Sequence, residues 1–300
     1  MTPFDLVDFD GHEAVHFVSD VDSGLEAIIA VHSTALGPAV GGCRYWSYEP
    51  RGAALIDVLR LSRGMSYKNA MAGLPFGGGK AVVFKRSGLS PDSIFAALGR
   101  AVDKLGGLYI TAEDVGTTVT DMQVVARSTR FVSGLRSSGD VAGGNPSPKT
   151  AYGVFISLQE GSRYLSARNL AGVHVAVQGL GAVGYYLCQR VHQAGARLFV
   201  ADVDDDRVRR VQREFGAVPV TPEAILSADI DILAPCALGA IVNADTIPRI
   251  SARLIAGGAN NQLATAEDGE RLRLAGILYA PDYIVNSGGI ICAASEYLGE

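Results

Sequence analysis

The sequence lacks the features of a disulfide-stabilised scaffold, a membrane protein or a nucleic-acid-binding surface. Its four cysteines are scattered over 300 residues without C-x-x-C spacing, which predicts reduced, buried thiols. No apolar run reaches the roughly 18 residues of a membrane span. The chain has no run of Lys or Arg and its net charge is −5, so we expect no nucleic acid and no membrane as a partner.

The N-terminus also lacks a targeting signal. Asp5, Asp8 and Asp10 stand where a secretory signal would have basic and then apolar residues, so we expect a cytoplasmic protein. What the chain does have is 48% hydrophobic and 19% charged residues. At this length, that composition is sufficient for two globular domains, each with its own core.

One short motif resembles a metal site. His12-Glu13-Ala14-Val15-His16 matches the H-E-x-x-H pattern of zinc proteases, which needs both histidines on one face of a helix. Here Gly11 precedes the motif and Val-His-Phe-Val alternates as in a strand, which would space the two histidines too far apart. No third ligand is evident, so we predict no metal.

Two lysines are the first candidates for chemistry. Lys68 closes the helical pattern of residues 51–65, where the helix dipole favours a cation. Lys80 follows three glycines and opens a predicted buried strand, beside backbone that a small group can approach closely. One lysine can hold an anion while the other does acid-base work. The alternative is two surface lysines that simply reach solvent.

Asp114 is the next candidate. The pattern predicts strands at residues 13–18, 25–31 and 108–110 and a helix beginning at Ser90-Pro91. Asp114 follows the third of these strands, on the side where open α/β sheets place ligand-binding loops. A carboxylate there can also be only a turn or helix cap.

Residues 134–148 form the longest stretch rich in Gly, Ser and Pro and are the natural boundary between two domains. We therefore predict an α/β substrate domain at residues 1–140 and a dinucleotide-binding Rossmann domain at residues 141–300. A helix from Ser147-Pro148 to about Leu165 and a strand at 173–178 open the second domain.

That strand runs into the G-x-G-x-x-G sequence formed by Gly179, Gly181 and Gly184, followed by a predicted helix at residues 185–194 and a second strand that ends at Asp202. The glycines permit a tight turn, approach of a pyrophosphate to the backbone of Ala182 and Val183 ahead of the helix, and close helix–strand packing. Asp202 would bind the ribose hydroxyls and repel a 2′-phosphate, which favours NAD over NADP. A strand–helix turn without a cofactor is the alternative.

Further strands at residues 230–234 and 253–256, and a weaker one at 277–279, continue the doubly wound pattern. The loop Gly257-Gly-Ala-Asn-Asn-Gln262 offers adjacent amides that suit a nicotinamide carboxamide or a substrate carboxylate. Amide pairs also cap turns, so this loop alone leaves both readings open.

Taken in order, these motifs resemble the NAD-dependent amino-acid dehydrogenases acting on glutamate, leucine, phenylalanine and valine, most closely the leucine/phenylalanine/valine branch. The resemblance covers nearly the whole chain and rests on the following segments: Leu36-Gly-Pro-Ala-Val-Gly-Gly42 with Arg44, Tyr67-Lys-Asn-Ala70, Gly77-Gly-Gly-Lys80, Thr111-Ala-Glu-Asp-Val-Gly116, the Gly179 turn, Ala234-Pro-Cys-Ala-Leu238, Ala259-Asn-Asn-Gln262 and Asn286-Ser-Gly-Gly289.

The resemblance implies a role for each matching residue. Lys68 would bind the substrate carboxylate, Lys80 would activate water during imine hydrolysis, and Asp114 would contact the amino group and assist proton transfer. It also implies two sets of contacts. The substrate would meet Gly42, Val40, Ala112, Asn261, Ile290 and Ala293; the cofactor would meet Thr150, Cys236, Ala237, Asn261 and Asn286 besides the Gly179 turn and Asp202.

The expected function is therefore an oxidoreductase that converts an apolar L-amino acid (leucine, valine or phenylalanine type) to its 2-oxo acid and ammonia, reversibly and with NAD, as a homo-oligomer. A catalytically inactive NAD-binding regulator is the alternative. A 2-hydroxy-acid dehydrogenase is disfavoured, since none of the five histidines falls in a strand-end motif. Family members continue beyond the point matching Glu300, so their C-terminal helices are expected to be absent here, in a shortened protein or a truncated one.

Overall fold

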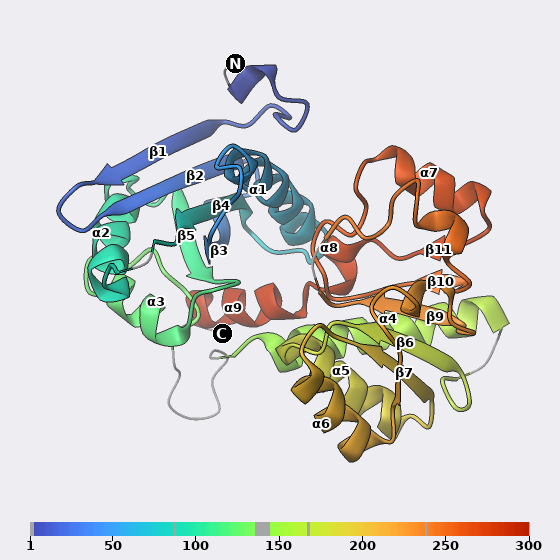
Figure 1. The fold of residues 1–300 in the computed structure, drawn as a ribbon. Coiled ribbons are helices and arrows are strands. Elements are labelled where there is room, and N and C mark those ends of the chain that lie inside the picture. Colours follow the sequence, from blue (N-terminus) through green and yellow to red (C-terminus); the bar gives the residue numbers. More distant parts are fainter. Residues whose placement is uncertain (1–2, 87, 136–144, 167–168, 238, 300) are drawn as a thin grey trace. The chain divides into compact units, whose positions relative to one another are not determined.

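The structure is a computed structural model that describes residues 3–86, 88–135, 145–166, 169–237 and 239–299. The chain divides into two compact units, Met1–Pro146 with Ile290–Glu300, and Ser147–Gly289. Each unit contains one sheet flanked by helices (Figure 1). The predicted ranges 1–140 and 141–300 differ from these units at the end of the chain, because residues 290–300 belong with the first unit. Much of the predicted linker, residues 136–144, lies outside the described residues.

The first unit is built on a five-stranded mixed sheet in the order β1-β2-β4-β3-β5. β1 and β2 pair antiparallel, β2 pairs antiparallel with β4, and β3 pairs parallel with both β4 and β5. The strands are β1 (Ala14–Asp20), β2 (Leu25–Ser33), β3 (Ala39–Trp46), β4 (Gly77–Phe84) and β5 (Tyr109–Glu113).

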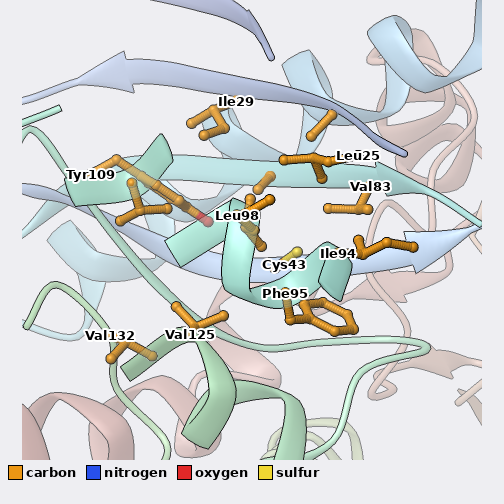
Figure 2. Close-up of a cluster of buried hydrophobic side chains, with 14 of the residues drawn as sticks. Leu25, Ile29, Cys43, Val83, Ile94, Phe95, Leu98, Tyr109, Val125 and Val132 are labelled. Atoms are coloured by element: carbon orange, nitrogen blue, oxygen red, sulfur yellow. The ribbon is translucent and has the colours of Figure 1, made fainter. Parts of the chain in front are cut away.

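Alternation along β2 directs its side chains to two different cores. Leu25 and Ile29 belong to the larger core, which they share with residues of α2 (Pro91–Lys104) and α3 (Val119–Ala126). Figure 2 shows this core, with Ile94, Phe95 and Leu98 of α2 among the strand residues. Ile28 and Ala30 point the other way and pack with α1 (Ala53–Met71). Helices therefore cover both faces of the sheet.

The second unit is an entirely parallel six-stranded sheet in the order β11-β10-β9-β6-β7-β8. Numbered from its first strand, this is the order 3-2-1-4-5-6 of the dinucleotide-binding Rossmann fold. The strands are β6 (His174–Gln178), β7 (Arg197–Ala201), β8 (Val218–Pro219), β9 (Ile232–Pro235), β10 (Leu254–Ile255) and β11 (Leu278–Tyr279). The predicted fold class, an α/β substrate domain and a Rossmann domain, is confirmed.

Helices also cover this sheet on both faces. Val175 and Val177 of β6 pack with α4 and α5, whereas Ala176 belongs to a separate core with Leu272 of α7. The helices of this unit are α4 (Ser147–Ser166), α5 (Ala182–Gln193), α6 (Asp205–Phe215), α7 (Glu267–Leu274) and α8 (Asp282–Val285), with short 3-10 turns at Ile225–Ser227 and Ile247–Arg249. Most of α9 (Gly288–Leu298) and the 3-10 turn at Pro3–Asp5 belong to the first unit. Within the described segments, no helix has both the length and the apolar character needed to cross a membrane.

The four cysteines are free thiols. Cys43 and Cys188 are buried, as predicted, and burial raises the pKa of both thiols above the usual range. The prediction of burial is wrong for Cys236 and Cys292, which are partly exposed. Cys236 directly follows β9 and Cys292 lies within α9, where neighbouring side chains cover each of them incompletely.

Candidate functional site

Lys80 and Asp114, far apart in the sequence, form an ion pair in the first unit. The Lys80 Nζ lies 2.9 Å from Asp114 Oδ2, and the Lys80 side chain is only 4% exposed. Arg44 Nε lies 3.2 Å from the same oxygen. Lys80 belongs to β4, Arg44 to β3, and Asp114 follows the end of β5. Three parallel strands therefore bring two cations to one carboxylate.

Gly42 of β3 leaves the space that this cluster needs. In the sheet, β3 lies between β4 and β5, and Gly42 pairs with Ala112. A Cβ at Gly42 would lie 2.6 Å from the Glu113 carbonyl oxygen and 2.8 Å from the Asp114 Cβ. A side chain at position 42 would thus displace Asp114 from its place between Lys80 and Arg44.

A tight turn fixes the backbone of Asp114. Its N–H donates to Thr117 Oγ1 at 2.8 Å, and the same hydroxyl lies 3.1 Å from the Cys43 carbonyl oxygen. Thr117 therefore ties the turn after β5 to β3. Sequence reasoning missed this residue, although a threonine three positions after an aspartate is a common turn partner.

The electrostatics of the cluster favour an ionised Asp114. Burial acts to raise the pKa of this carboxyl, but Lys80 and Arg44 outweigh it and hold the pKa well below the usual range. Burial acts to lower the pKa of Arg44, and the carboxylates of Asp114 and Asp57 raise it overall. Arg44 is thus a permanent cation in this cluster.

Arg44 extends the cluster to two residues that the sequence analysis did not single out. Its Nη1 lies 2.7 Å from Asp57 Oδ2, and the Tyr48 hydroxyl donates to the same oxygen at 2.5 Å. Asp57 lies on α1 between the buried Ala54, Val58 and Leu61. A carboxylate within an apolar helical stripe is the signal that could have identified it.

Lys68 lies where the sequence placed it, in the last turn of α1, and is half-buried. The helix is longer than the predicted range 51–65. It approaches β4 closely because Gly78 has no side chain. A Cβ at this position would lie 2.2 Å from the Ser66 backbone nitrogen. The side chain of Asn69 also donates to the Gly77 carbonyl oxygen at 2.6 Å. The three glycines before Lys80 are therefore part of β4. The group that approaches their backbone is helix α1.

The predicted substrate positions of the first unit differ in their surroundings. Val40 is buried in a cluster with Ala294, and Ile290 packs against the same cluster. Ala112 is 8% exposed and pairs with Gly42. Ala293 is half-buried, and its carbonyl oxygen accepts from Ser133 Oγ at 2.8 Å. The structure thus places Val40 and Ile290 in one apolar cluster.

The glycine turn of the second unit has the geometry expected of a dinucleotide site. Gly179 has a φ of +93° and a Cβ there would meet Ala237 at 2.7 Å, while a Cβ at Gly184 would meet the Gly179 carbonyl oxygen at 1.9 Å. By contrast, a Cβ at Gly181, the N-cap of α5, would meet nothing within 4 Å. The open position is the one where a pyrophosphate would approach the helix N-terminus. Helix α5 begins at Ala182, three residues before the predicted start.

Asp202 lies at the end of β7, next to this turn. Its Oδ2 accepts from the Leu180 N–H at 2.5 Å and its Oδ1 from the Asp204 N–H at 2.9 Å. Arg207 Nη1 lies 3.8 Å from Asp202 Oδ2, and its Nε lies 3.2 Å from Asp204 Oδ2. The first turn of α6 thus brings Arg207 beside Asp202.

The amide residues of the second unit meet around the ends of β10 and α8. The Asn286 Nδ2 donates to Asn260 Oδ1 at 2.8 Å and to the Gly258 carbonyl oxygen at 3.2 Å, and Gly258 N–H contacts Cys236 Sγ at 3.5 Å. The Asn286 Oδ1 is buried and has no hydrogen-bond partner among the residues that the structure describes. Such an atom fits a ligand donor, for example the amide of a nicotinamide.

The other predicted cofactor residues lie in the same unit. Asn261 has a φ of +51°, and its carbonyl oxygen accepts from the Ala240 N–H at 2.7 Å. Thr150 lies in the first turn of α4, where its backbone nitrogen is 3.2 Å from the Cβ position of Gly288. Cys236 and Ala237 follow β9, beside the Gly179 turn. Leu238, the last residue of that motif, lies outside the described residues.

The H-E-x-x-H segment serves the packing of α1. His16 is in strand β1, and His12 precedes the strand. The His12 Nδ1 accepts from the Asp10 N–H at 3.2 Å, so its Nε2 carries the proton and donates toward the Leu59 carbonyl oxygen at 3.0 Å. Among the described residues, no group of three or more His, Cys, Asp or Glu side chains could hold a metal ion.

Comparison with known sequences assigns both units. Residues 12–131 match the family described as "Glu/Leu/Phe/Val dehydrogenase, dimerisation domain". Residues 145–208 and 200–300 match "Glutamate/Leucine/Phenylalanine/Valine dehydrogenase". A leucine dehydrogenase of Bacillus cereus is 48% identical over 299 residues, which are 99% of this chain and 81% of the relative.

Solved structures give the same result. The crystal structure of L-tryptophan dehydrogenase from Nostoc punctiforme matches 96% of this chain and 83% of its own, with a TM-score of 0.76 and 44% identity. Hetero-hexameric glutamate dehydrogenase from Thermus thermophilus, in a form with leucine bound, has a TM-score of 0.78 over 97% of this chain and 77% of its own. At 23% identity, the second likeness supports the fold alone. The chain therefore belongs to the glutamate/leucine/phenylalanine/valine dehydrogenase family, in the branch of leucine dehydrogenase, and is an amino-acid dehydrogenase that uses a pyridine nucleotide.

Proposed function

We propose that the protein catalyses the reversible oxidative deamination of an apolar L-amino acid to its 2-oxo acid and ammonia, with NAD as hydride acceptor. The observation that carries the proposal is the buried cluster of Lys80, Asp114 and Arg44. The missing side chain of Gly42 leaves the space that Asp114 occupies in this cluster. A lysine and a carboxylate held together in a family of amino-acid dehydrogenases suit the proton transfers that release an amino group.

Lys68, Asp114 and Lys80 have distinct parts in the proposed reaction. Lys68 holds the substrate carboxylate, and the anionic Asp114 faces the substrate amino group. The bound cofactor supplies the hydride acceptor for the hydrogen on Cα. Loss of that hydride and of one amino proton leaves an imine, which water attacks at the same carbon. In its neutral form, Lys80 accepts the proton of that water, and a proton then passes to the nitrogen, which departs as ammonia.

We assign cofactor binding to the second unit. The Gly179 turn and the N-terminus of α5 would hold the pyrophosphate, and Asp202 the ribose hydroxyls. The orphaned Oδ1 of Asn286, together with Asn261, would meet the nicotinamide amide. NAD is favoured over NADP because the carboxylate of Asp202 would repel a 2′-phosphate.

An apolar substrate follows from the proposed side-chain positions. Val40, Ala112, Ile290 and Ala293 carry no charge, so the side-chain carboxylate of glutamate would be desolvated without a partner, at a cost of several kcal/mol. The similar proteins from Bacillus cereus and Nostoc punctiforme are named for leucine and tryptophan. The small Ala293 leaves room for an aromatic as well as an aliphatic side chain, so phenylalanine stays among the proposed substrates.

Ammonia-dependent oxidation of NADH tests the proposal directly. We expect turnover with the 2-oxo acids of leucine, valine, phenylalanine or tryptophan and little with that of glutamate. The Lys80→Ala variant is the matched control for contaminating activity. Turnover with 2-oxo acids in the absence of ammonia would indicate a hydroxy-acid dehydrogenase, and NADH binding without any turnover would indicate a regulator. Efficient turnover of glutamate would contradict the assignment of an apolar substrate.

We further propose a homo-oligomeric, cytoplasmic enzyme. The first unit matches a domain described by its dimerisation, and the related glutamate dehydrogenase from Thermus thermophilus is hetero-hexameric. β1 is also an edge strand of its sheet. The free backbone groups of an edge strand offer one place where a second copy could pair.

A further inference from the structure

The carboxylate of Asp114 belongs to a chain of polar contacts that continues away from Lys80. Arg44 donates through Nε to Asp114 at 3.2 Å and through Nη1 to Asp57 at 2.7 Å. The Tyr48 hydroxyl donates to the same Asp57 oxygen at 2.5 Å. Strand β3, the segment after it and helix α1 each contribute one member. The guanidinium of Arg44 is therefore held between two carboxylates from different elements.

These charges are balanced and largely shielded from water. Exposed fractions are 17% for the Arg44 side chain, 21% for Asp57, 16% for Asp114 and 4% for Lys80. Two positive and two negative groups share this region, so each has a partner. Removing one member of such a set leaves a shielded charge without its counterpart, which is costly.

We propose that Arg44, braced by Asp57 and Tyr48, is a positioning residue for the reaction and fixes the carboxylate of Asp114 opposite Lys80. The inference rests on the proposed function of the Lys80–Asp114 pair. Arg44 acts through Asp114 and touches neither substrate nor cofactor in this assignment. This positioning role explains why a second cation, Arg44, lies beside the Asp114 carboxylate that already pairs with Lys80.

The electrostatic consequence is that Asp114 is ionised before substrate binds. Burial alone would raise its pKa, and the two cations hold the pKa well below the usual range. The other titratable groups that act on Asp114, or on which it acts, are Glu113, Cys43 and Tyr109, with Asp121 beside Glu113. None of these four is a cation; Lys80, Arg44 and a backbone hydrogen bond from Val115 favour the ionised form.

An arginine is required because one group must reach two carboxylates in fixed directions. The planar guanidinium presents separate N–H groups to Asp114 and Asp57, whereas a lysine has a single ammonium on a flexible stem. Arg44→Lys therefore keeps the charge and loses the geometry, and Arg44→Gln loses both. This pair of variants separates electrostatic support from positioning.

The experiment measures kcat, KM and the pH profile of deamination in the full-length protein. We expect Arg44→Gln to lower kcat by about tenfold to a hundredfold, the usual cost of a misplaced catalytic group. The KM for the amino acid should change less, and the acid limb of the profile should move to higher pH. Arg44→Lys should restore the position of the acid limb but only part of kcat. Asp57→Asn and Tyr48→Phe should give progressively smaller losses in kcat.

The matched control is Arg100→Gln, which breaks an exposed ion pair with Asp20 in the same unit. We expect this variant to behave as the wild type. A purely structural network would lower the melting temperature of Arg44→Gln and leave the pH profile in place, and that result would overturn the inference. If Arg44→Gln fails to fold, Asp57→Asn and Tyr48→Phe provide the same test, since each removes fewer contacts of the network than Arg44→Gln does.

A second readout does not depend on turnover. In protein labelled with ¹³C at the aspartate carboxyl groups, the resonance of Asp114 is identified by its loss in Asp114→Asn. We expect its titration midpoint to move to higher pH in Arg44→Gln and to stay in place in Arg100→Gln. An unchanged midpoint would contradict the inference. An inactive wild type would refute the proposed function, and this titration would still test Arg44.

Discussion

At the scale of single residues, substitutions of Lys80 and Lys68 should have different effects on kcat and KM. Lys80→Ala removes the proposed base and should lower kcat by roughly a hundredfold to ten-thousandfold, the usual range for general acid-base catalysis. NAD binding should survive, since the Gly179 turn and Asp202 belong to the second unit. Steady-state kinetics over pH and a cofactor-binding titration measure these effects.

Lys68→Ala is the comparison for that variant. It removes a charge that holds substrate in both ground and transition states, so KM should rise with a smaller loss of kcat. If Lys80→Ala kept most of its kcat, we would assign the base to Asp114 instead.

Asp202 and Arg207 together should decide the choice of cofactor. Asp202→Ser should weaken NAD binding by roughly tenfold to a hundredfold, as expected for hydrogen bonds to a charged group. It should also partly admit NADP, because Arg207, now paired with Asp202 and Asp204, becomes available to a 2′-phosphate. Adding Arg207→Ala should remove that gain. Kinetic constants for both cofactors provide the measurement, and a wild type that uses NADP as well as NAD would contradict the assignment.

At the scale of elements, the docking of α1 on β4 depends on Gly78. A Cβ there would lie 2.2 Å from the Ser66 backbone nitrogen and 2.5 Å from the Ser62 carbonyl oxygen. Because backbone cannot yield as a side chain can, Gly78→Ala should cost roughly 1–3 kcal/mol of unfolding free energy. It should also raise KM, since α1 carries Lys68. Urea unfolding and substrate kinetics measure the two effects.

Gly64 on the same helix is the control. A Cβ at Gly64 would meet nothing within 4 Å, and alanine is favoured over glycine in a helix by up to about 1 kcal/mol. Gly64→Ala should therefore stabilise the protein or leave it unchanged. Equal losses in the two variants would show that close packing at Gly78 is not the cause.

The contact of His12 with α1 should make stability depend on pH. Burial lowers the pKa of His12 below its usual 6.5, partly offset by its bond to Leu59, and burial also lowers the pKa of His32. Between the folded and unfolded pKa values the unfolded chain binds more protons, so the unfolding free energy should fall as pH drops below 6.5. Below the folded pKa values, this contribution should become constant.

His12→Gln keeps a donor for the Leu59 carbonyl oxygen and removes the titrating group. Chemical unfolding above and below pH 6.5 should show a shallower decline in this variant than in the wild type. A difference between the two proteins that does not vary with pH would argue against His12 as the source.

Two of the elements that the sequence analysis missed, β3 and α3, were missed for different physical reasons. Strand β3 contains Gly41, Gly42 and Arg44, which interrupt the alternation that normally marks a strand. It forms because its neighbours β4 and β5 supply hydrogen bonds on both sides. Gly42 breaks the pattern because a side chain at this position would displace Asp114. Helix α3 was missed because it is short, although Thr118 and Asp121 form a capping box at its start.

At the scale of the whole molecule, the chain is two compact units with separate cores, and we expect several copies to associate. Light scattering coupled to size-exclusion chromatography should give a mass of at least twice 31.4 kDa. Edge-strand pairing through β1 would bury backbone groups that a single copy leaves open. A mass of one chain at all protein concentrations would contradict the proposal.

The sequence by itself determined the two-domain α/β plan, the Rossmann unit, the family and the identities of Lys68, Lys80 and Asp114 as candidates. These follow from local patterns, such as hydrophobic periodicity, capping residues and glycine spacing, which act over a few neighbouring positions. The family resemblance then assigned roles to positions that local patterns alone left open.

Only the tertiary structure decided which charges meet. The contacts of Arg44 with Asp114 and Asp57 depend on strand register and on the docking of α1, whereas Arg207 is brought beside Asp202 by the first turn of α6. These contacts arise from the packing of whole elements, and the local patterns of the sequence did not reveal them. The ionisation of Asp114 follows from that packing, because in the folded chain two cations act on the carboxyl and outweigh its burial.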